Sequence, residues 1–315
     1  DTTLHTSFFL PAGLIIDGVA QANSGGQVLL WQHLFWFYSH PAVYIMILPG
    51  MGVISEVIPT FARKAVFGYA AIVYSTLGIA VVGSLVWAHH MFTSGMSDTA
   101  VFVFSLLTFL VAVPSAVKVF NWVATLYKGS IELAPPLFFA LSFIVLFSIG
   151  GLGGLVLGSA GTNVHVHDTQ FVVGHFHYVM FGGAGFAFLA AIHYWFPKMF
   201  GRMYDCESAM WGACILIVGF NIQYFPMLIL GMEGMPRRYY DYVPRFKQLN
   251  ALSTIGSWIL AVGLFVILFN LLRSFFFAPK IAQSPWTGTT LEWTTPTPPP
   301  VENFPEGGAG EKGTP

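Results

Sequence analysis

Four histidines and one aspartate fall within sixteen otherwise mostly apolar residues, HVHDTQFVVGHFHYVM, at positions 165–180. His175 and His177 lie two residues apart, so on a helix that turns 100° per residue their side chains point roughly 200° apart. They cannot both bind one metal ion, but each can bind a different one. The alternative is that each histidine is a hydrogen-bonded residue of the protein interior. The spacing leaves both interpretations open: one helix between two metal sites, or two core histidines.

A second group of candidate ligands comes earlier in the chain. His40 is followed by a proline, and Tyr44 lies four residues further, so the two side chains share one helix face, one turn apart. His89 and His90 are adjacent and point about 100° apart, so a small distortion at a helix end would direct both at one ion. Three imidazoles with no thiolate nearby suit copper, or less specifically zinc or iron.

One lysine lies inside an apolar segment. Lys118 occurs in the run PSAVKVF, with Ser115 three residues earlier on the same face. An unpaired lysine deep in a membrane span costs about 2.5 to 3.5 kcal/mol on insertion scales. Ser55 and Glu56 add polar groups near the end of the first apolar segment, and the eleven residues from Tyr44 to Ser55 span roughly 16 Å of helix. These groups can link a mid-membrane site to the inner surface, unless Lys118 simply extends to the interface.

Polar pairs also occur outside the apolar segments. His167 and Asp168 form an HD pair suited to a hard cation, either as ligands or as groups that orient its ligands. Arg237 and Arg238 offer paired guanidiniums, which suit bidentate binding of carboxylates. We interpret His165 as a solvated loop residue.

The composition has too few charges for a water-exposed globular surface. Of the 315 residues, 55% are hydrophobic and 9% are charged, and the mean hydropathy is +0.69. The chain is therefore predicted to be an integral membrane protein. Apolar runs of about 20 residues predict an all-α, polytopic transmembrane helix bundle with seven spans. These spans are 28–54, 67–92, 99–127, 136–159, 170–196, 209–231 and 252–277.

The distribution of positive charge predicts the orientation of the spans. If the first span runs from the outside inward, most lysines and arginines fall in inner segments, as the positive-inside rule requires. These are Arg63, Lys64, Lys128, Lys198, Arg202, Arg273 and Lys280. A cluster of four in one outer connection indicates a local anionic partner. It consists of Arg237, Arg238, Arg245 and Lys247. The net charge of −1 gives no reason to expect a nucleic-acid partner.

The chain divides into three parts. Residues 1–27 predict an outer loop, residues 28–278 the transmembrane bundle, and residues 279–315 a Pro-rich inner-side tail that is extended and partly disordered. Cys206, expected in a loop, and Cys214, expected in a span, give no disulfide framework. The chain does not begin with Met, and an odd number of spans places its ends on opposite faces, so we expect a fragment or a split subunit.

Five motifs in a fixed order carry a family resemblance. HPAVY, WAHHMF, VKVF, HDTQFVVGHFHYV and GMPRRYYDY resemble the catalytic subunit of heme-copper terminal oxidases, cytochrome c oxidase subunit I. The similarity extends to LHTSFFLPAG near the start and TTLEW in the tail. It covers nearly the whole chain but only the second half of the family's subunit. The resemblance therefore implies the last seven of twelve spans.

The resemblance implies the ligands of three redox metals. The copper of a binuclear centre would be bound by His40, His89 and His90. His175 would be the axial ligand of a high-spin heme and His177 one axial ligand of a low-spin heme, both hemes being of the A type. Tyr44 would be joined covalently to His40 and would supply an electron and a proton as O2 is cleaved.

The same resemblance assigns the surrounding polar residues. Lys118 and Ser115 would line a proton pathway that rises from Ser55 and Glu56 to Tyr44. At the outer side, a guanidinium pair would hold heme propionates, and a magnesium ion would be shared with subunit II. The residues concerned are Arg237 and Arg238 for the propionates, and His167 and Asp168 for magnesium.

One position departs from the usual family pattern. Most members have Glu where Ala42 stands, and that carboxyl relays protons to the heme site. Here Tyr38 lies one turn before Ala42 on the same face, with Ser39 beside it. The arrangement resembles the branch of the family in which a Tyr-Ser pair replaces the Glu in the proton pathway.

The resemblance implies a respiratory terminal oxidase that takes electrons from cytochrome c, reduces O2 to water and couples this reaction to proton translocation. A quinol oxidase of the same family is the first alternative. A nitric oxide reductase is less favoured, because those enzymes lack the tyrosine of HPAVY and the lysine of VKVF. A heme or metal transporter would not need opposed histidines, a propionate clamp and a proton-carrying lysine together. Expected partners are subunits II and III, the N-terminal half of subunit I and the lipid bilayer, in a bacterial cytoplasmic membrane.

Overall fold

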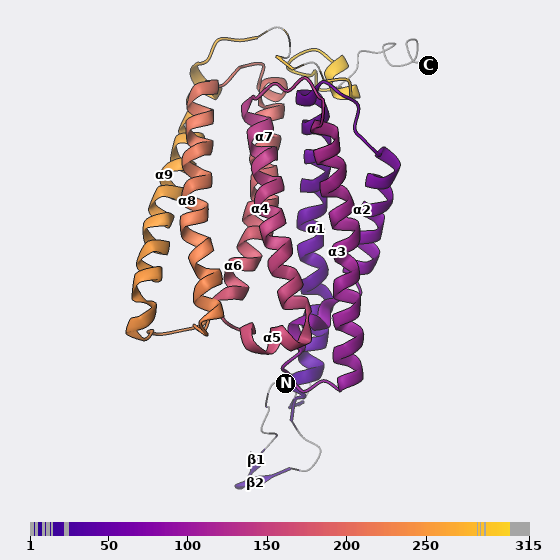
Figure 1. Cartoon of the computed structure of the whole chain (residues 1–315), viewed down its shortest axis with the longest axis vertical. Helices are drawn as coiled ribbons and strands as arrows, with labels where there is room; N and C mark the ends of the chain where they lie inside the picture. Colours follow the sequence, from indigo (N-terminus) through magenta and orange to yellow (C-terminus); the bar gives the residue numbers. More distant parts are fainter. Residues whose placement is uncertain are drawn as a thin grey trace.

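The computed structural model describes residues 25–281 without interruption, together with 3, 6, 7, 10, 13, 15–21, 283, 285, 286 and 288–302. Its long helices run side by side in an antiparallel bundle (Figure 1). They are α1 (Val28–Ala62), α2 (Tyr69–Gly83), α3 (Asp98–Leu126), α4 (Pro135–Gly158), α6 (Gln170–Val179), α7 (Phe186–Phe200), α8 (Cys206–Met232) and α9 (Lys247–Phe277). The short elements are β1 (Ile15–Ile16), β2 (Val19–Ala20), α5 (Ala160–Val166) and the segments η1 (Trp87–Met91), η2 (Met180–Gly185), η3 (Pro244–Phe246) and η4 (Leu291–Thr294).

The predicted fold class is confirmed. Within the described ranges, six helical segments are long and apolar enough to cross a membrane, and α2, with 15 residues, is a shorter apolar helix. The predicted span 67–92 is wrong in its second half, because α2 ends at Gly83 and the WAHHM sequence forms the 3-10 helix η1. A 15-residue helix is about 22 Å long, less than the roughly 30 Å of a hydrocarbon core.

The first helix is longer than predicted. α1 continues past the expected end at 54 to Ala62, although Pro41, Pro49 and Pro59 lie within it. Membrane helices tolerate proline where neighbouring groups satisfy the freed backbone carbonyls. As a consequence, Ser55 and Glu56 belong to α1 rather than to a segment beyond it.

Two residues expected in loops belong to helices. His165 lies in the last turn of α5, where it is exposed to solvent as expected. Cys206 is the first residue of α8, because the carboxylate of Asp205 accepts the backbone N–H of Ser208 at 2.8 Å and caps the helix. Hydrogen bonds from the Ser208 side chain and backbone hold the pKa of Asp205 below its usual value.

We call the end of the bundle where α1 ends the inner end, following the predicted orientation, and the opposite end the outer end. The inner end lies at the top of Figure 1. There, Arg63 forms an ion pair of 2.7 Å with Glu132. The ammonium of Lys64 donates to the carbonyls of Ala124 and Tyr127 at 3.0 and 2.8 Å, where α3 ends. These cations therefore satisfy carboxylate and backbone groups at helix ends.

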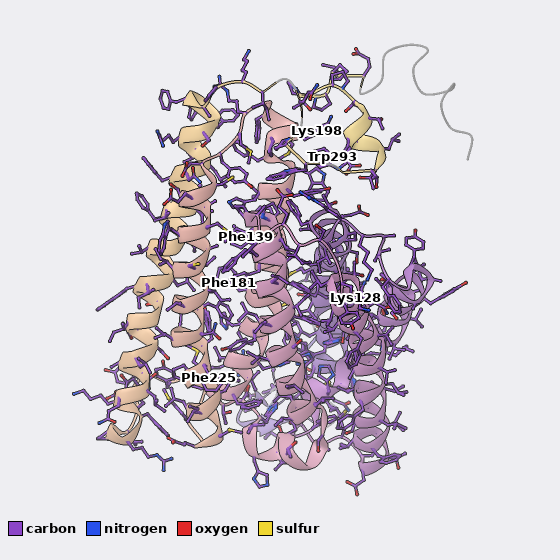
Figure 2. The ribbon with its side chains drawn as sticks, turned by 45° about the horizontal axis from the view of Figure 1, so that its top comes forward. Lys128, Phe139, Phe181, Lys198, Phe225 and Trp293 are labelled. Carbon is purple, nitrogen blue, oxygen red and sulfur yellow. The ribbon has the colours of Figure 1, made fainter. Side chains whose placement is uncertain are left out.

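The interior of the bundle is packed from α1, α4, α6 and α7, and Figure 2 shows Phe139 and Phe181 inside it. Phe225 of α8 is half-exposed instead, as expected for a lipid-facing or partner-facing position. Gly150 permits a close approach of α4 to α6, since a Cβ there would lie 2.9 Å from the backbone nitrogen of Val179. Small residues allow such approaches between membrane helices.

The predicted span 170–196 is not one regular helix. Between α6 and α7 the glycine-rich sequence MFGGAG forms the π-helical segment η2. Single turns of this kind interrupt α-helices frequently at functional sites. The wider turn rotates the residues of α7 about the helix axis relative to those of α6. The 100° step of an α-helix therefore does not predict which residues of α6 and α7 share a face.

Part of the predicted tail packs against the inner end of α7. Lys198 donates to the carbonyls of Thr295 and Pro296 at 2.5 and 3.0 Å. The ring of Trp293 lies 4.9 Å from that of Tyr194, and Figure 2 shows Lys198 and Trp293 close together. Residues 303–315 of the predicted tail lie outside the described residues, as do most positions of the predicted outer loop before residue 15.

Candidate metal centre

Three histidines predicted as ligands of one metal converge near the outer half of the bundle. His40 comes from α1, and His89 and His90 come from η1. One ring nitrogen of each lies within 4.8 Å of the other two, and His40 Nδ1 is 3.1 Å from His90 Nε2. His89 and His90 lie in the 3-10 helix η1 just beyond the end of α2, with their ring centroids 4.4 Å apart.

Contacts with neighbouring helices fix two of these rings. The hydroxyl of Thr108 on α3 donates to the Phe104 carbonyl at 2.6 Å, so it accepts from His89 Nδ1, 3.1 Å away. This leaves His89 Nε2 with its lone pair free for a metal. The ring of His90 stacks on Trp36 with centroids 3.7 Å apart and planes 9° from parallel. Neither Thr108 nor Trp36 carries a sequence signal that marks it for this role.

The donor set fits copper. His40 is 6% exposed, and its Nδ1 faces the other two rings, 3.1 Å from His90 Nε2. Among the described residues, the cluster consists of imidazoles alone, without a carboxylate or a thiolate. Three neutral imidazole nitrogens suit Cu ions, and a cation between them would offset the crowding of their lone pairs.

Tyr44 lies beside this cluster, as its spacing from His40 predicted. The two ring centroids are 4.7 Å apart, with the planes at 68°. The Tyr44 ring also contacts α2 at Gly83, where a Cβ would lie 2.9 Å from Tyr44 Cε2. Any larger residue at this position would displace the Tyr44 ring, so Gly83 is part of the site, although the sequence did not single it out.

The two histidines of α6 face different neighbours. His175 Nδ1 bonds to the carbonyl of Gly150 on α4, and His177 Nδ1 bonds to that of Val173, both at 2.8 Å. His177 also stacks on Tyr224 of α8, with centroids 4.2 Å apart. In each imidazole Nδ1 is the donor, which leaves Nε2 as a free ligand atom. The two rings therefore fit axial ligation of separate hemes.

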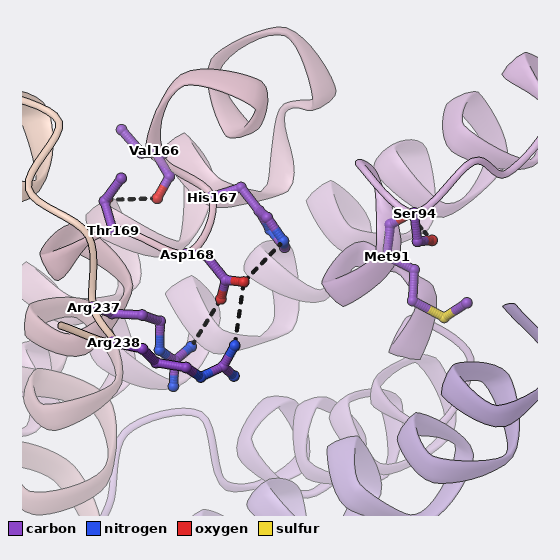
Figure 3. A network of polar contacts seen from close by, with 8 residues as sticks. All are labelled: Met91, Ser94, Val166, His167, Asp168, Thr169, Arg237 and Arg238. Carbon is purple, nitrogen blue, oxygen red and sulfur yellow. Dashed lines mark hydrogen bonds and ion pairs between the residues drawn. The ribbon is translucent and has the colours of Figure 1, made fainter. Parts of the chain in front are cut away.

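A polar network joins the outer ends of α6 and α8 (Figure 3). The carboxylate of Asp168 lies 3.8 Å from Arg237, 3.4 Å from Arg238 and 3.8 Å from His167 Nε2. The backbone N–H of Arg237 donates to the Asp168 carbonyl at 2.8 Å. This bond joins the segment before α6 to the segment after α8. The structure thus brings together two pairs that the sequence analysis treated separately.

This network retains an excess of positive charge. Two guanidiniums face one carboxylate, since Arg237 and Arg238 share Asp168. Partial burial and then the neighbouring Arg238 lower the pKa of Arg237, while Asp168 opposes them. A guanidinium remains charged at neutral pH even so. The arginine pair can therefore bind further carboxylates.

Lys118 lies in a cavity of about 250 Å³ between α1, α2 and α3. Ser55 and Glu56 line the same cavity, as does Thr76, which the sequence analysis missed. Ser115 does not line it, and its hydroxyl donates to the Val111 carbonyl of its own helix at 3.1 Å. Lys118 is only 1% exposed, so it does not extend to the interface.

The predicted Tyr38 and Ser39 pair lies elsewhere. Tyr38 is 63% exposed on the side of α1, Ser39 is partly exposed, and neither lines the Lys118 cavity. Their proton role remains a prediction.

Comparisons with known proteins agree with these motifs. The family model for Cytochrome C and Quinol oxidase polypeptide I matches residues 2–259. Cytochrome c oxidase subunit 1 of Thermostichus vulcanus is 47% identical over 304 residues, which cover 96% of this chain and 53% of the relative. Its counterpart in Synechocystis sp. is 48% identical over 306 residues, which cover 97% and 54%.

A solved structure shows the same architecture. One chain in the cryo-EM structure of a heme-copper terminal oxidase dimer matches with a TM-score of 0.74 and 26% sequence identity, over 80% of this chain and 50% of that chain. The chain thus spans about half the length of the curated relatives it matches. It is an integral membrane protein, and it belongs to the family of cytochrome c and quinol oxidase polypeptide I.

Proposed function

We propose that this chain is the metal-binding half of the catalytic subunit of a respiratory terminal oxidase, which reduces O2 to water with electrons from cytochrome c and translocates protons. The observation that carries the proposal is the convergence of three imidazoles beside a tyrosine, with a buried lysine cavity further inward. A transporter needs no such combination. The relatives named above as cytochrome c oxidase subunit 1 support the same function.

The cofactors proposed are two hemes of the A type and one copper ion, which together supply the electron transfer and O2 binding. His40, His89 and His90 would hold the copper, with the copper-facing nitrogen of His89 set by Thr108. His175 would hold the high-spin heme, and His177 one side of the low-spin heme.

Tyr44 is proposed as a donor of one electron and one proton. The phenol ring lies next to His40, whose Nε2 has no hydrogen-bond partner among the described groups. A bond between this nitrogen and the Tyr44 ring would remove one hydrogen from each side chain, and O2 would accept the electrons. The bond would hold the phenol at the metal cluster.

The Lys118 cavity is proposed as the inner part of a proton pathway. Its volume of about 250 Å³ has room for several water molecules, and hydroxyl and carboxylate groups line it. Glu56 is exposed and can take up protons, Ser55 lines the cavity, and Lys118 can carry protons toward Tyr44.

The outer network is proposed to serve two ligands. Arg237 and Arg238 would bind the carboxylates of the heme propionates, and His167 with Asp168 would bind magnesium shared with subunit II. The expected assembly includes subunits II and III and the remainder of subunit I in a bacterial cytoplasmic membrane. Exposed apolar side chains such as Phe37 and Ile45 on α1 are suited to contacts with these parts or with lipid.

The function is tested on a membrane complex purified with this chain. Given reduced cytochrome c and O2, it is expected to consume O2 with complete reduction to water and to acidify the medium around proteoliposomes. Oxidation of quinol alone would support the first alternative. Conversion of nitric oxide to nitrous oxide without O2 consumption would overturn the proposal in favour of a reductase, which the presence of Tyr44 and Lys118 disfavours.

Replacing both Arg237 and Arg238 with alanine is expected to lower the heme midpoint potentials, on the order of 50 mV. Loss of positive charge stabilises the oxidised iron, and Asp168 would keep its negative charge without its two partners. A spectroscopic redox titration measures the shift. Arg245→Ala is the matched control, because its guanidinium bonds to the Glu233 carbonyl rather than to Asp168. Unchanged potentials in the double variant with both hemes retained would contradict the propionate assignment.

A further inference from the structure

The buried ammonium of Lys118 has a specific acceptor. Its Nζ donates to the Thr76 hydroxyl of α2 at 2.6 Å. Among the described residues, this hydroxyl is the hydrogen-bond acceptor of the ammonium. Trp122 lies one turn further along α3, with its ring centroid 5.7 Å from Nζ, close enough for a cation–π contact. No described carboxylate lies within the 4.0 Å that defines an ion pair with Lys118.

The Thr76 hydroxyl is held so that it can act only as an acceptor toward the lysine. Its own proton is donated to the Ile72 carbonyl at 2.8 Å, which leaves the oxygen lone pairs for the ammonium. The hydroxyl thus cannot rotate to donate to Lys118 without losing its backbone partner. This arrangement holds the lysine nitrogen at this place in the cavity.

On the α1 side of the cavity, the hydroxyl of Ser55 is not available to hold the ammonium. Ser55 donates to the Met51 carbonyl at 2.9 Å and accepts from Trp122 Nε1 at 3.0 Å, so it is already engaged on both sides. A lysine side chain has four rotatable bonds and requires an acceptor to hold its end in one position. Thr76 supplies that acceptor on the α2 side, between the inner end of the cavity and Tyr44.

We infer that Thr76 is the positioning residue for Lys118: its hydroxyl accepts the ammonium hydrogen bond and holds the proton carrier at one place in the cavity. The inference rests on the proposed function, since it concerns the proton pathway of the oxidase. Thr76 acts through Lys118 and contacts none of the predicted metal ligands. Its neighbour Gly83, two turns further along α2, touches Tyr44, so α2 joins the lysine to the tyrosine.

The inference is tested by Thr76→Val in the complete oxidase, which keeps the shape of the side chain and removes the acceptor. Reduction of the high-spin heme under anaerobic stopped-flow conditions is expected to slow on the order of tenfold, the usual effect of losing a hydrogen bond to a charged group. Thr76→Ser retains a hydroxyl and is expected to restore the rate to within about twofold of wild type. Thr254→Val is the matched control, because this α9 hydroxyl bonds to a carbonyl of its own helix in the same way but contacts no lysine.

The outcomes separate the inference from the proposed function. Wild-type reduction in Thr76→Val, with slow reduction in Lys118→Met, overturns the role of Thr76 and leaves the pathway intact. Wild-type reduction in both overturns the pathway and the inference with it. Equal slowing in Thr76→Val and Thr76→Ser also overturns the inference, because a hydroxyl would not restore function. If Thr76→Val does not retain both hemes, Thr76→Ala is measured instead, with the same expected slowing and the same contrary result.

Discussion

His177→Leu is expected to remove the low-spin heme from the assembled oxidase and retain the high-spin heme, while His175→Leu is expected to do the reverse. The reason is that the two imidazoles lie on opposite sides of α6, His175 against α4 and His177 against Tyr224 of α8. Leucine fills a similar volume but has no lone pair to offer an iron. Reduced-minus-oxidised spectra, with carbon monoxide binding as a measure of the high-spin site, report each heme separately.

His193→Leu is the matched control for this pair. His193 is fully buried in α7, and its Nδ1 bonds to the Leu189 carbonyl at 2.7 Å, as His177 Nδ1 bonds to the carbonyl one turn before it. It is not predicted to bind a metal, so both heme signals are expected to remain. Loss of the same heme in His175→Leu and His177→Leu would show that the two histidines do not serve different irons.

Lys118→Met is expected to leave both hemes and copper bound but to slow reduction of the high-spin heme by on the order of a hundredfold or more. Electrons entering a buried site need accompanying protons for charge balance, and methionine carries none. The low-spin heme should still be reduced quickly, because it does not depend on this cavity. Anaerobic stopped-flow spectroscopy at the two heme wavelengths measures the contrast.

Lys128→Met provides the comparison for that experiment. Lys128 lies in the inner connection after α3, outside the cavity, with its ammonium 5.5 Å from the ring centroid of Tyr127. Its variant is expected to reduce both hemes at wild-type rates. Rapid reduction of the high-spin heme in Lys118→Met would exclude Lys118 as a proton carrier and would remove one of the features that favour an oxidase over a nitric oxide reductase.

Local spacing was sufficient to predict several parts of this site. A separation of two residues on a helix implies opposed side chains, and His175 and His177 do face different helices, α4 and α8. A separation of four implies one shared face, and the rings of His40 and Tyr44 are neighbours. Low charge and long apolar runs were likewise sufficient to predict an all-α membrane bundle.

The partner of Lys118 shows where local spacing misleads. Ser115 shares a helix face with Lys118, yet it does not line the cavity, and the acceptor of the ammonium comes from another helix. Serine and threonine in membrane helices commonly bond to the carbonyl one turn before them. Thr76 and Ser115 both do so, and only the packing of α2 against α3 places the Thr76 oxygen beside the lysine.

The sequence by itself determined which imidazoles, phenol and ammonium are available for chemistry. It also determined on which face of its own helix each of them lies. Tertiary structure alone decided what surrounds them, because helical periodicity relates positions within one helix and carries no information between helices. Thr108 from α3 orients His89, Thr76 from α2 holds Lys118, and Gly83 makes room for Tyr44. Each of these contacts depends on how two helices pack against each other, and no pattern along the chain encodes that relation.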